Sequence, residues 1–223
     1  MRRFLTLVTV ALALVAVLGA EARAEKPTPT GSTPSMYGAQ VIPRGRTLVG
    51  VTVGYPSLRP QFVWGVRRRF DVGFIPALTY GVNHDGYRQR LGLNLEIPLR
   101  WAFAEGRHGS FGMRIMPYFR VGESAPAFSV GSNIGFRVGI AFPRIFTLIF
   151  GPEGRIGFAS VGDSPNRADG LDAELTGMVG LESFIKRKFL VSLEMHFGHE
   201  FGAGQLPGGE LIVRGWVGFG YVF

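Results

Sequence analysis

The chain has 223 residues, of which 46% are hydrophobic, and this size suits one folded domain with an additional segment. It contains no cysteine, which excludes disulfide bonds, thiolate catalysis and thiolate metal ligands. The formal net charge of +8 favours anionic partners or internal charge pairing. No nucleic-acid fingerprint, phosphate-binding glycine motif or metal-ligand spacing stands out, so we expect neither nucleic acid nor a cofactor.

The N-terminus has the order of a secretory signal peptide. Arginines at positions 2 and 3 precede an apolar run over 4–20, and a small-x-small triplet at 22–24 offers a cleavage site before Glu25. We therefore expect residues 1–24 to be removed on export. A retained anchor helix is the alternative, which is disfavoured because the apolar run is short. In an exported chain, the basic charge favours anionic lipid or internal pairing over nucleic acid.

Residues 25–45 are expected to form a flexible leader. Between 25 and 38 they are rich in Pro, Thr and Ser and lack hydrophobic periodicity. Such composition is typical of a linker without a packed core. The folded domain is then predicted to span residues 46–223.

The clearest pattern in the chain lies between Arg90 and Phe103. Its odd positions are large and apolar: Leu91, Leu93, Leu95, Ile97, Leu99, Trp101 and Phe103. Its even positions are charged, polar or small: Arg90, Gly92, Asn94, Glu96, Pro98, Arg100 and Ala102. A period of two predicts a strand with different environments on its two faces. The segment is long enough to cross a membrane, since a tilted spanning strand needs about 9 to 11 residues.

Similar alternation predicts ten strands in all. Their ranges are 46–55, 61–66, 70–82, 90–103, 111–121, 130–140, 146–158, 171–184, 191–200 and 213–223. Pro152 and Gly154 are awkward inside a sheet, so we expect a bulge in 146–158. The fold predicted is all-β: a transmembrane antiparallel up-and-down β-barrel, with eight or twelve strands as alternatives to ten. An even strand number puts both termini on one side, together with the tight turns.

Composition indicates that the polar faces of these strands are enclosed. The chain has 21 Arg against 3 Lys, and 33 Gly. Arginine is preferred for confined ion pairs because its planar fork makes several hydrogen bonds. Glycine weakens an ordinary strand but fits the crowded inner side of a narrow barrel. The alternative is a soluble sandwich or lipocalin-like barrel, in which the apolar faces would point inward.

Among the residues predicted to point inward, there are equal numbers of basic and acidic side chains. The bases are Arg46, Arg90, Arg100, Arg114, Arg120, Arg137, Arg155 and Arg214. The acids are Asp71, Glu96, Glu153, Asp172, Glu174, Glu182, Glu194 and Glu200. Because an unpaired buried charge is costly, we expect these groups to pair across the lumen. The network would fill the barrel as a structural element, or line a narrow, porin-like passive path for small solutes.

The C-terminus resembles the targeting strand of bacterial outer-membrane β-barrel proteins. The chain ends on Phe223, with Tyr221 and Phe219 at the same parity. The resemblance is to a class and covers the architecture of the whole mature chain. It implies location in the outer membrane of a Gram-negative cell envelope with periplasmic termini. It also implies outer-membrane lipids and the barrel-assembly machinery as partners.

One cluster could carry chemistry. Glu194, His196 and Glu200 share an inward face, and a His beside carboxylates can act as a general base. Lipid A deacylases of the outer membrane carry a His-x-Ser-Asn-Ala stretch on a late strand, which this region resembles in its histidine. The serine is missing here, since Gly198 stands two residues after His196. We therefore expect a non-enzymatic barrel, with a lipid-modifying hydrolase as the alternative.

The predicted tight turns are strongly basic. They contain Arg67, Arg68, Arg69, Arg107, Arg144, Lys186, Arg187 and Lys188. These side chains could bind the phosphates of the inner leaflet and fix the depth of the barrel in the membrane. Ordinary solvated turns are the alternative, because exposed charges are cheap.

Overall fold

A computed structural model describes residues 34–55, 57–84, 87–122, 127–142, 146–161, 168–185, 188–204 and 211–223. The predicted signal peptide and the first part of the predicted leader lie outside these residues. Among the residues described, no helix is long and apolar enough to cross a membrane.

Every regular element in the described ranges is a β-strand. The strands are β1 (Thr47–Tyr55), β2 (Ser57–Arg67), β3 (Phe70–His84), β4 (Tyr87–Glu96), β5 (Leu99–Glu105), β6 (Gly109–Gly122), β7 (Ala127–Phe142), β8 (Phe146–Val161), β9 (Ala168–Ile185), β10 (Phe189–Gly204) and β11 (Leu211–Val222).

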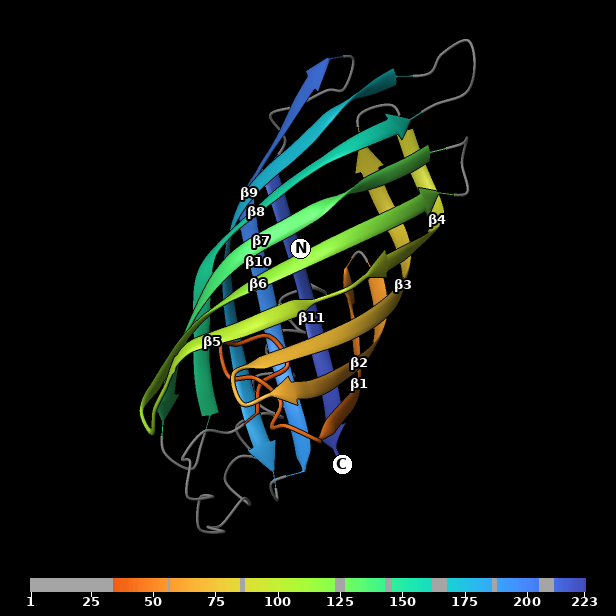
Figure 1. Cartoon of the computed structure of the whole chain (residues 1–223). Helices are drawn as coiled ribbons and strands as arrows, with labels where there is room; N and C mark the ends of the chain where they lie inside the picture. Colours follow the sequence, from red (N-terminus) through yellow and green to blue (C-terminus); the bar gives the residue numbers. More distant parts are fainter. Residues whose placement is uncertain are drawn as a thin grey trace, which may run out of the picture.

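These strands close into an antiparallel barrel with ten strand positions around its wall (Figure 1). Strand β1 pairs with both β2 and β11, which joins the first strand to the last. Strands β4 and β5 together occupy one strand position, because both pair with β3 on one side and with β6 on the other. The predicted all-β, ten-stranded barrel is confirmed.

The break between β4 and β5 has a local cause. Pro98 has no backbone N–H, so it cannot donate to the ladder. The neighbouring backbone still bonds on both sides: Gly73 N donates to Pro98 O at 2.8 Å, and Ile97 N donates to Pro117 O at 3.0 Å. The hydrogen bonding to the two neighbouring strands therefore continues through the interruption at Pro98.

The bulge predicted in 146–158 is wrong. Strand β8 keeps one register with β7 and one with β9 along its length. A proline removes one donor but inserts no extra residue, so Pro152 leaves the register unchanged. The irregularities lie elsewhere, between Gly65 and Arg67 in β2 and between Ala102 and Ala104 in β5.

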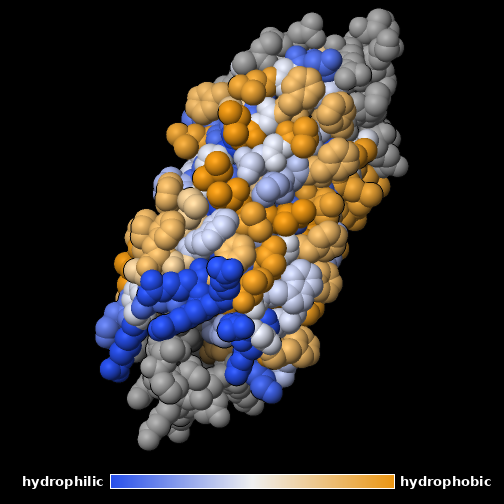
Figure 2. All heavy atoms as spheres, in the orientation of Figure 1, coloured by the Kyte–Doolittle hydropathy of each residue, from blue (hydrophilic) through white to orange (hydrophobic). Residues whose placement is uncertain are grey.

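The outer surface is apolar around much of the barrel (Figure 2). Large side chains of the outward parity are strongly exposed, with Leu93 at 68%, Leu175 at 59% and Ile156 at 55%. Aromatic rings pair toward the ends of the strands, as in Phe128 with Phe158 and in Phe70 with Trp101. This orientation is the reverse of the lipocalin-like alternative, in which these side chains would face one another.

The two ends of the barrel differ. Strand β1 begins and β11 ends at the end where β2, β5, β7 and β9 also finish, which we call the turn end (Figure 1). We call the opposite end the loop end. Described turn-end residues include the exposed bases Arg67, Arg68, Arg69, Arg107 and Lys188.

Candidate functional site

The lumen at the turn end is filled by the chain's own N-terminal segment (Figure 1). Residues 35–42, here called the N-terminal plug, are buried throughout, with Met36 at 3%, Tyr37 at 2% and Ile42 at 0% exposure. This part of the predicted flexible leader is therefore packed inside the barrel. The prediction of a flexible leader rested on its Pro, Thr and Ser content. It did not take into account the apolar residues of the segment, which the barrel wall buries.

One carboxylate on the wall accepts two backbone N–H groups of the plug. Glu182 Oε1 in β9 accepts from Met36 N at 2.9 Å and from Tyr37 N at 2.8 Å. Across the lumen, Gln61 Nε2 in β2 donates to the Tyr37 hydroxyl at 3.3 Å. Burial raises the pKa of Tyr37 above its ordinary range, and the nearby charge of Glu194 acts in the same direction. The hydroxyl therefore stays neutral at physiological pH.

A buried ion pair holds both ends of the plug. Arg100 in β5 binds Asp71 in β3 through two hydrogen bonds, at 2.8 Å and 2.6 Å. The same guanidinium donates to the carbonyl oxygens of Ser35 and Met36, and Asp71 accepts from Ile42 N at 2.7 Å. Two groups predicted as lumen charges thus satisfy backbone polar groups of a segment that the sequence placed outside the barrel.

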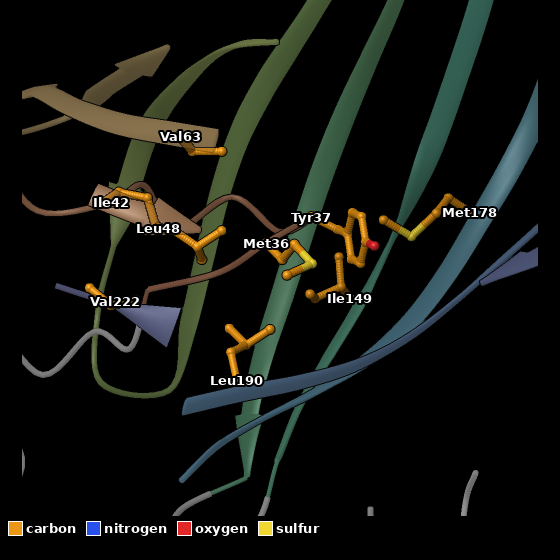
Figure 3. Close-up of a cluster of buried hydrophobic side chains, with 9 residues drawn as sticks. All are labelled: Met36, Tyr37, Ile42, Leu48, Val63, Ile149, Met178, Leu190 and Val222. Atoms are coloured by element: carbon orange, nitrogen blue, oxygen red, sulfur yellow. The ribbon is translucent and has the colours of Figure 1, made fainter. Parts of the chain in front are cut away.

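Apolar side chains of the wall pack against the plug (Figure 3). The cluster joins Met36, Tyr37 and Ile42 to inward residues of six strands: Leu48, Val63, Ile149, Met178, Leu190 and Val222. All nine are almost completely buried. The turn-end half of the lumen therefore contains a hydrophobic cluster beside the charged groups that bind the plug, and we did not predict this cluster.

Inward glycines make space for this segment. A Cβ atom at Gly65 would lie 2.1 Å from the carbonyl oxygen of Pro43, and one at Gly50 would lie 2.7 Å from Met36 Cε. At Gly112 a Cβ would be 3.2 Å from Ala39 Cβ. These glycines permit a close approach of the plug, in addition to suiting a narrow barrel.

Most of the predicted inward charges do lie inside the barrel. Buried ones are Glu96, Arg100, Arg114, Arg137, Glu153, Arg155, Asp172, Glu174, Glu182, Glu194, Glu200 and Asp71. Arg120 and Arg214 are partly buried. Arg46 is exposed, since it precedes β1 at the turn end, and that assignment is wrong. The side chain of Arg90 lies outside the described part.

Toward the middle of the barrel, acids and bases are in direct contact. Glu153 in β8 accepts from Arg114 at 2.6 Å and also binds Arg137. Glu96 in β4 forms an ion pair with Arg59 in β2. We did not predict Arg59 as an inward base, because the prolines at 56 and 60 indicated a turn there. The inward direction of Arg59 could have been predicted from Gln61, which lies two residues later on the same face and is also buried.

Toward the loop end, Arg155 is surrounded by three carboxylates. It lies 2.8 Å from Asp172, 3.0 Å from Glu174 and 3.0 Å from Glu200. Glu174 also pairs with Arg214 at 2.9 Å. Because each contact joins different strands, this cluster ties β8 to β9, β10 and β11.

The predicted catalytic cluster is divided between two environments. His196 Nε2 lies 2.6 Å from Glu194 Oε1, and its ring meets the Trp216 ring edge-on at 5.4 Å. Glu200 belongs to the Arg155 cluster. The nearby hydroxyl of Ser57 accepts a hydrogen bond from Trp216 Nε1 at 3.1 Å. A His and Glu pair is present, but no nucleophile is seen bonded to it among the described residues.

Metal binding has no visible basis in the described ranges. No group of three or more His, Asp or Glu side chains there is arranged to hold a metal ion. The carboxylates that do converge, around Arg155, are already engaged by that guanidinium.

Comparison with known proteins adds little. No protein-family model matches the chain. No curated protein matches it either. Among solved structures it is similar to OmpT (in-vitro folded), an outer membrane protein of Vibrio cholerae, with a TM-score of 0.35 and 13% identity over 92% of this chain and 73% of that one. A likeness this weak carries no inference, so the fold rests on the strand pairing.

Proposed function

We propose that the protein is an integral outer-membrane β-barrel with a structural role, whose lumen is sealed at the turn end by its own N-terminal plug. The observation that carries the proposal is the burial of residues 35–42 against six strands. Sealing of this kind opposes free passage of solutes. A conducting state then requires the plug to leave.

The membrane location is supported by the outer surface. Exposed Leu, Ile, Val and Phe side chains surround the barrel, and closure leaves no sheet edge to be solvated. Phe223 and Tyr221 lie exposed on the outside at the turn end, where the assembly machinery of a Gram-negative outer membrane could bind the last strand. We place the turn end, and with it both termini, on the periplasmic side.

The charged part of the lumen supports a filled interior. The Arg114–Glu153 ion pair reaches from β6 past β7 to β8, and the Arg155–Glu174 pair joins β8 to β9, both at contact distance. Groups held this closely neutralise one another. A passive path for small solutes would have to run beside these pairs and past the plug. We therefore favour the structural role over the narrow channel.

A lipid-modifying hydrolase is less well supported. His196 is 5% exposed and faces the lumen, whereas acyl chains of membrane lipids meet the outer surface of the barrel. Its hydrogen bond to Glu194 provides a stable place for the imidazole within the interior. We assign no catalytic role to Glu194, His196 or Glu200.

Conductance in planar lipid bilayers tests the sealing directly. The mature barrel is expected to give no conductance steps, while a variant lacking residues 25–42 gives small steps, because the turn-end lumen is then empty and only the ion pairs of the middle narrow the path. A variant lacking only residues 25–33 is the matched control, since it keeps the plug, and it is expected to stay silent. Heat-modifiable electrophoretic mobility verifies that each variant is folded. Equal conductance in all three proteins would refute the sealing.

A further inference from the structure

Arg120 lies near the loop end of the lumen, two residues before the end of β6 at Gly122. In the sheet it stands opposite Asn94 of β4 on one side and Ser129 of β7 on the other. Residues directly opposite on antiparallel strands have side chains on the same face. Arg120 therefore extends into the interior between two uncharged polar residues.

Arg120 differs from the other inward arginines that the structure describes. Its guanidinium carbon lies 5.9 Å from the centre of the Tyr118 ring. Its Nε is buried without a hydrogen-bond partner, as are those of Arg59, Arg114, Arg137 and Arg155, so the difference is that no ion pair of Arg120 with a carboxylate is seen among the described residues. Six other inward arginines form ion pairs with carboxylates: Arg59, Arg100, Arg114, Arg137, Arg155 and Arg214.

Arg120 also has positive neighbours. Arg155 and Arg214 act on it electrostatically, but each of them is already held by carboxylates of its own. A guanidinium that is largely withdrawn from water is costly when it has no counterion. An anion bound beside Arg120 would remove this cost.

A second unsatisfied group belongs to Asn94, which stands directly opposite Arg120 in the sheet. Asn94 donates through Nδ2 to Glu96 at 2.7 Å, so its Oδ1 points away from that carboxylate, and this oxygen is buried without a donor. An oxygen in this position accepts a hydrogen bond from a hydroxyl. The pair of Arg120 and Asn94 therefore suits an oxyanion that still carries a proton.

Solvent reaches this level of the barrel. The Arg214 side chain is 24% exposed although its parity is inward, and Arg120 is also partly exposed. The plug closes the other end. A small ligand would thus enter from the loop end and reach Arg120 before the ion pairs of the middle.

We propose that the loop-end half of the lumen contains a binding site for a protonated oxyanion such as a hydrogen phosphate group. Arg120 is the principal ligand, and Asn94 opposite it accepts the hydroxyl of the anion. The site is independent of the plug, since Asn94 lies on β4 and Arg120 lies on β6.

Equilibrium dialysis with labelled inorganic phosphate tests the site on the detergent-folded barrel, at pH 6 and constant chloride and ionic strength. The wild type is expected to bind phosphate saturably, and Arg120→Gln to bind at least tenfold more weakly. Sulfate, which has the same shape but no proton, is expected to bind about 2- to 10-fold more weakly than phosphate because one hydrogen bond is lost. Arg107→Gln, an exposed base at the turn end, is the control and is expected to bind as wild type.

Absence of saturable phosphate binding by the folded wild type would overturn the proposal, and so would wild-type binding by a folded Arg120→Gln. Sulfate binding as tight as phosphate binding would overturn the role of Asn94. These results do not depend on conductance, so the site and the sealing of the barrel fail or succeed separately.

Discussion

Gly65 shows at the scale of one residue how tightly the barrel wall and the plug are fitted. Its missing side chain faces backbone, with the carbonyl oxygens of Pro43 and Ile42 at 2.1 and 2.4 Å from where a Cβ would lie. A backbone carbonyl cannot rotate away as the end of a methionine can. The contact therefore leaves no room for any other amino acid without moving the chain.

We predict that Gly65→Ala destabilises the barrel by about 1 to 3 kcal/mol, the usual cost of overpacking. Thermal unfolding in detergent, followed by the loss of the fast electrophoretic band, measures the change. Gly177→Ala is the matched control, because its Cβ would lie 3.9 Å from the nearest atom, the carbonyl oxygen of Phe197. Equal melting temperatures for Gly65→Ala and wild type would contradict the close fit.

Buried charges at this scale have two different tasks. Near the turn end, Asp71, Arg100 and Glu182 bind backbone groups of the plug. Nearer the loop end, Arg155 and its carboxylates bind one another across strands. Parity along the strands identified all of these as inward groups. It could not tell the two tasks apart, because the charges near the turn end bind backbone groups of the plug, which parity does not reveal.

At the scale of elements, the sequence was sufficient for the strands and insufficient for the plug. Alternation predicted inward and outward faces that match the observed burial from Leu91 to Phe103, while the interruption at Pro98 and the irregularity after Ala102 were missed. The reason is that period two is local and repeats many times. A plug of eight residues has no period, and its partners are distant along the chain.

A signal for the plug was nevertheless present in the wall. Leu48, Ile149, Met178 and Leu190 occupy inward positions in strands whose other inward residues are mostly glycine or charged. Apolar side chains at one end of a lumen require an apolar partner there. Met36, Tyr37 and the Val41-Ile42 pair in the leader could have been matched to them. Arg59 was missed for a different reason: the prolines at 56 and 60 made the start of β2 look like a turn.

The turns form the second kind of element with a testable role. Arg67, Arg68, Arg69 and Arg107 are exposed at the turn end. We infer that they contact phosphates of the adjacent leaflet, each contributing on the order of 1 kcal/mol near an anionic surface.

Replacement of Arg67, Arg68 and Arg69 by glutamate is predicted to reduce binding of the detergent-free barrel to phosphatidylglycerol vesicles at least tenfold. Insertion into phosphatidylcholine vesicles is expected to be unchanged, which serves as the control. Unchanged association with the anionic vesicles would show that these turns are simply solvated.

On the scale of the whole molecule, the barrel has an apolar exterior, a charged middle and one end that its N-terminal plug closes. The exterior suits lipid, because it exposes large hydrophobic side chains over a closed sheet (Figure 2). At the plugged end, apolar side chains of the plug and of the barrel wall form one buried cluster (Figure 3). Stability and closure thus come from the same contacts.

Cysteine accessibility within the first described segment tests this arrangement most directly. The chain has no cysteine, so Met36→Cys and Arg44→Cys each introduce a single thiol. Met36 is 3% exposed inside the barrel, whereas Arg44 lies exposed eight residues later. With a membrane-impermeant maleimide and the folded barrel, Met36→Cys is predicted to react at least a hundredfold more slowly than Arg44→Cys, and equally fast only after denaturation. Equal rates in the folded barrel would contradict the sealed lumen.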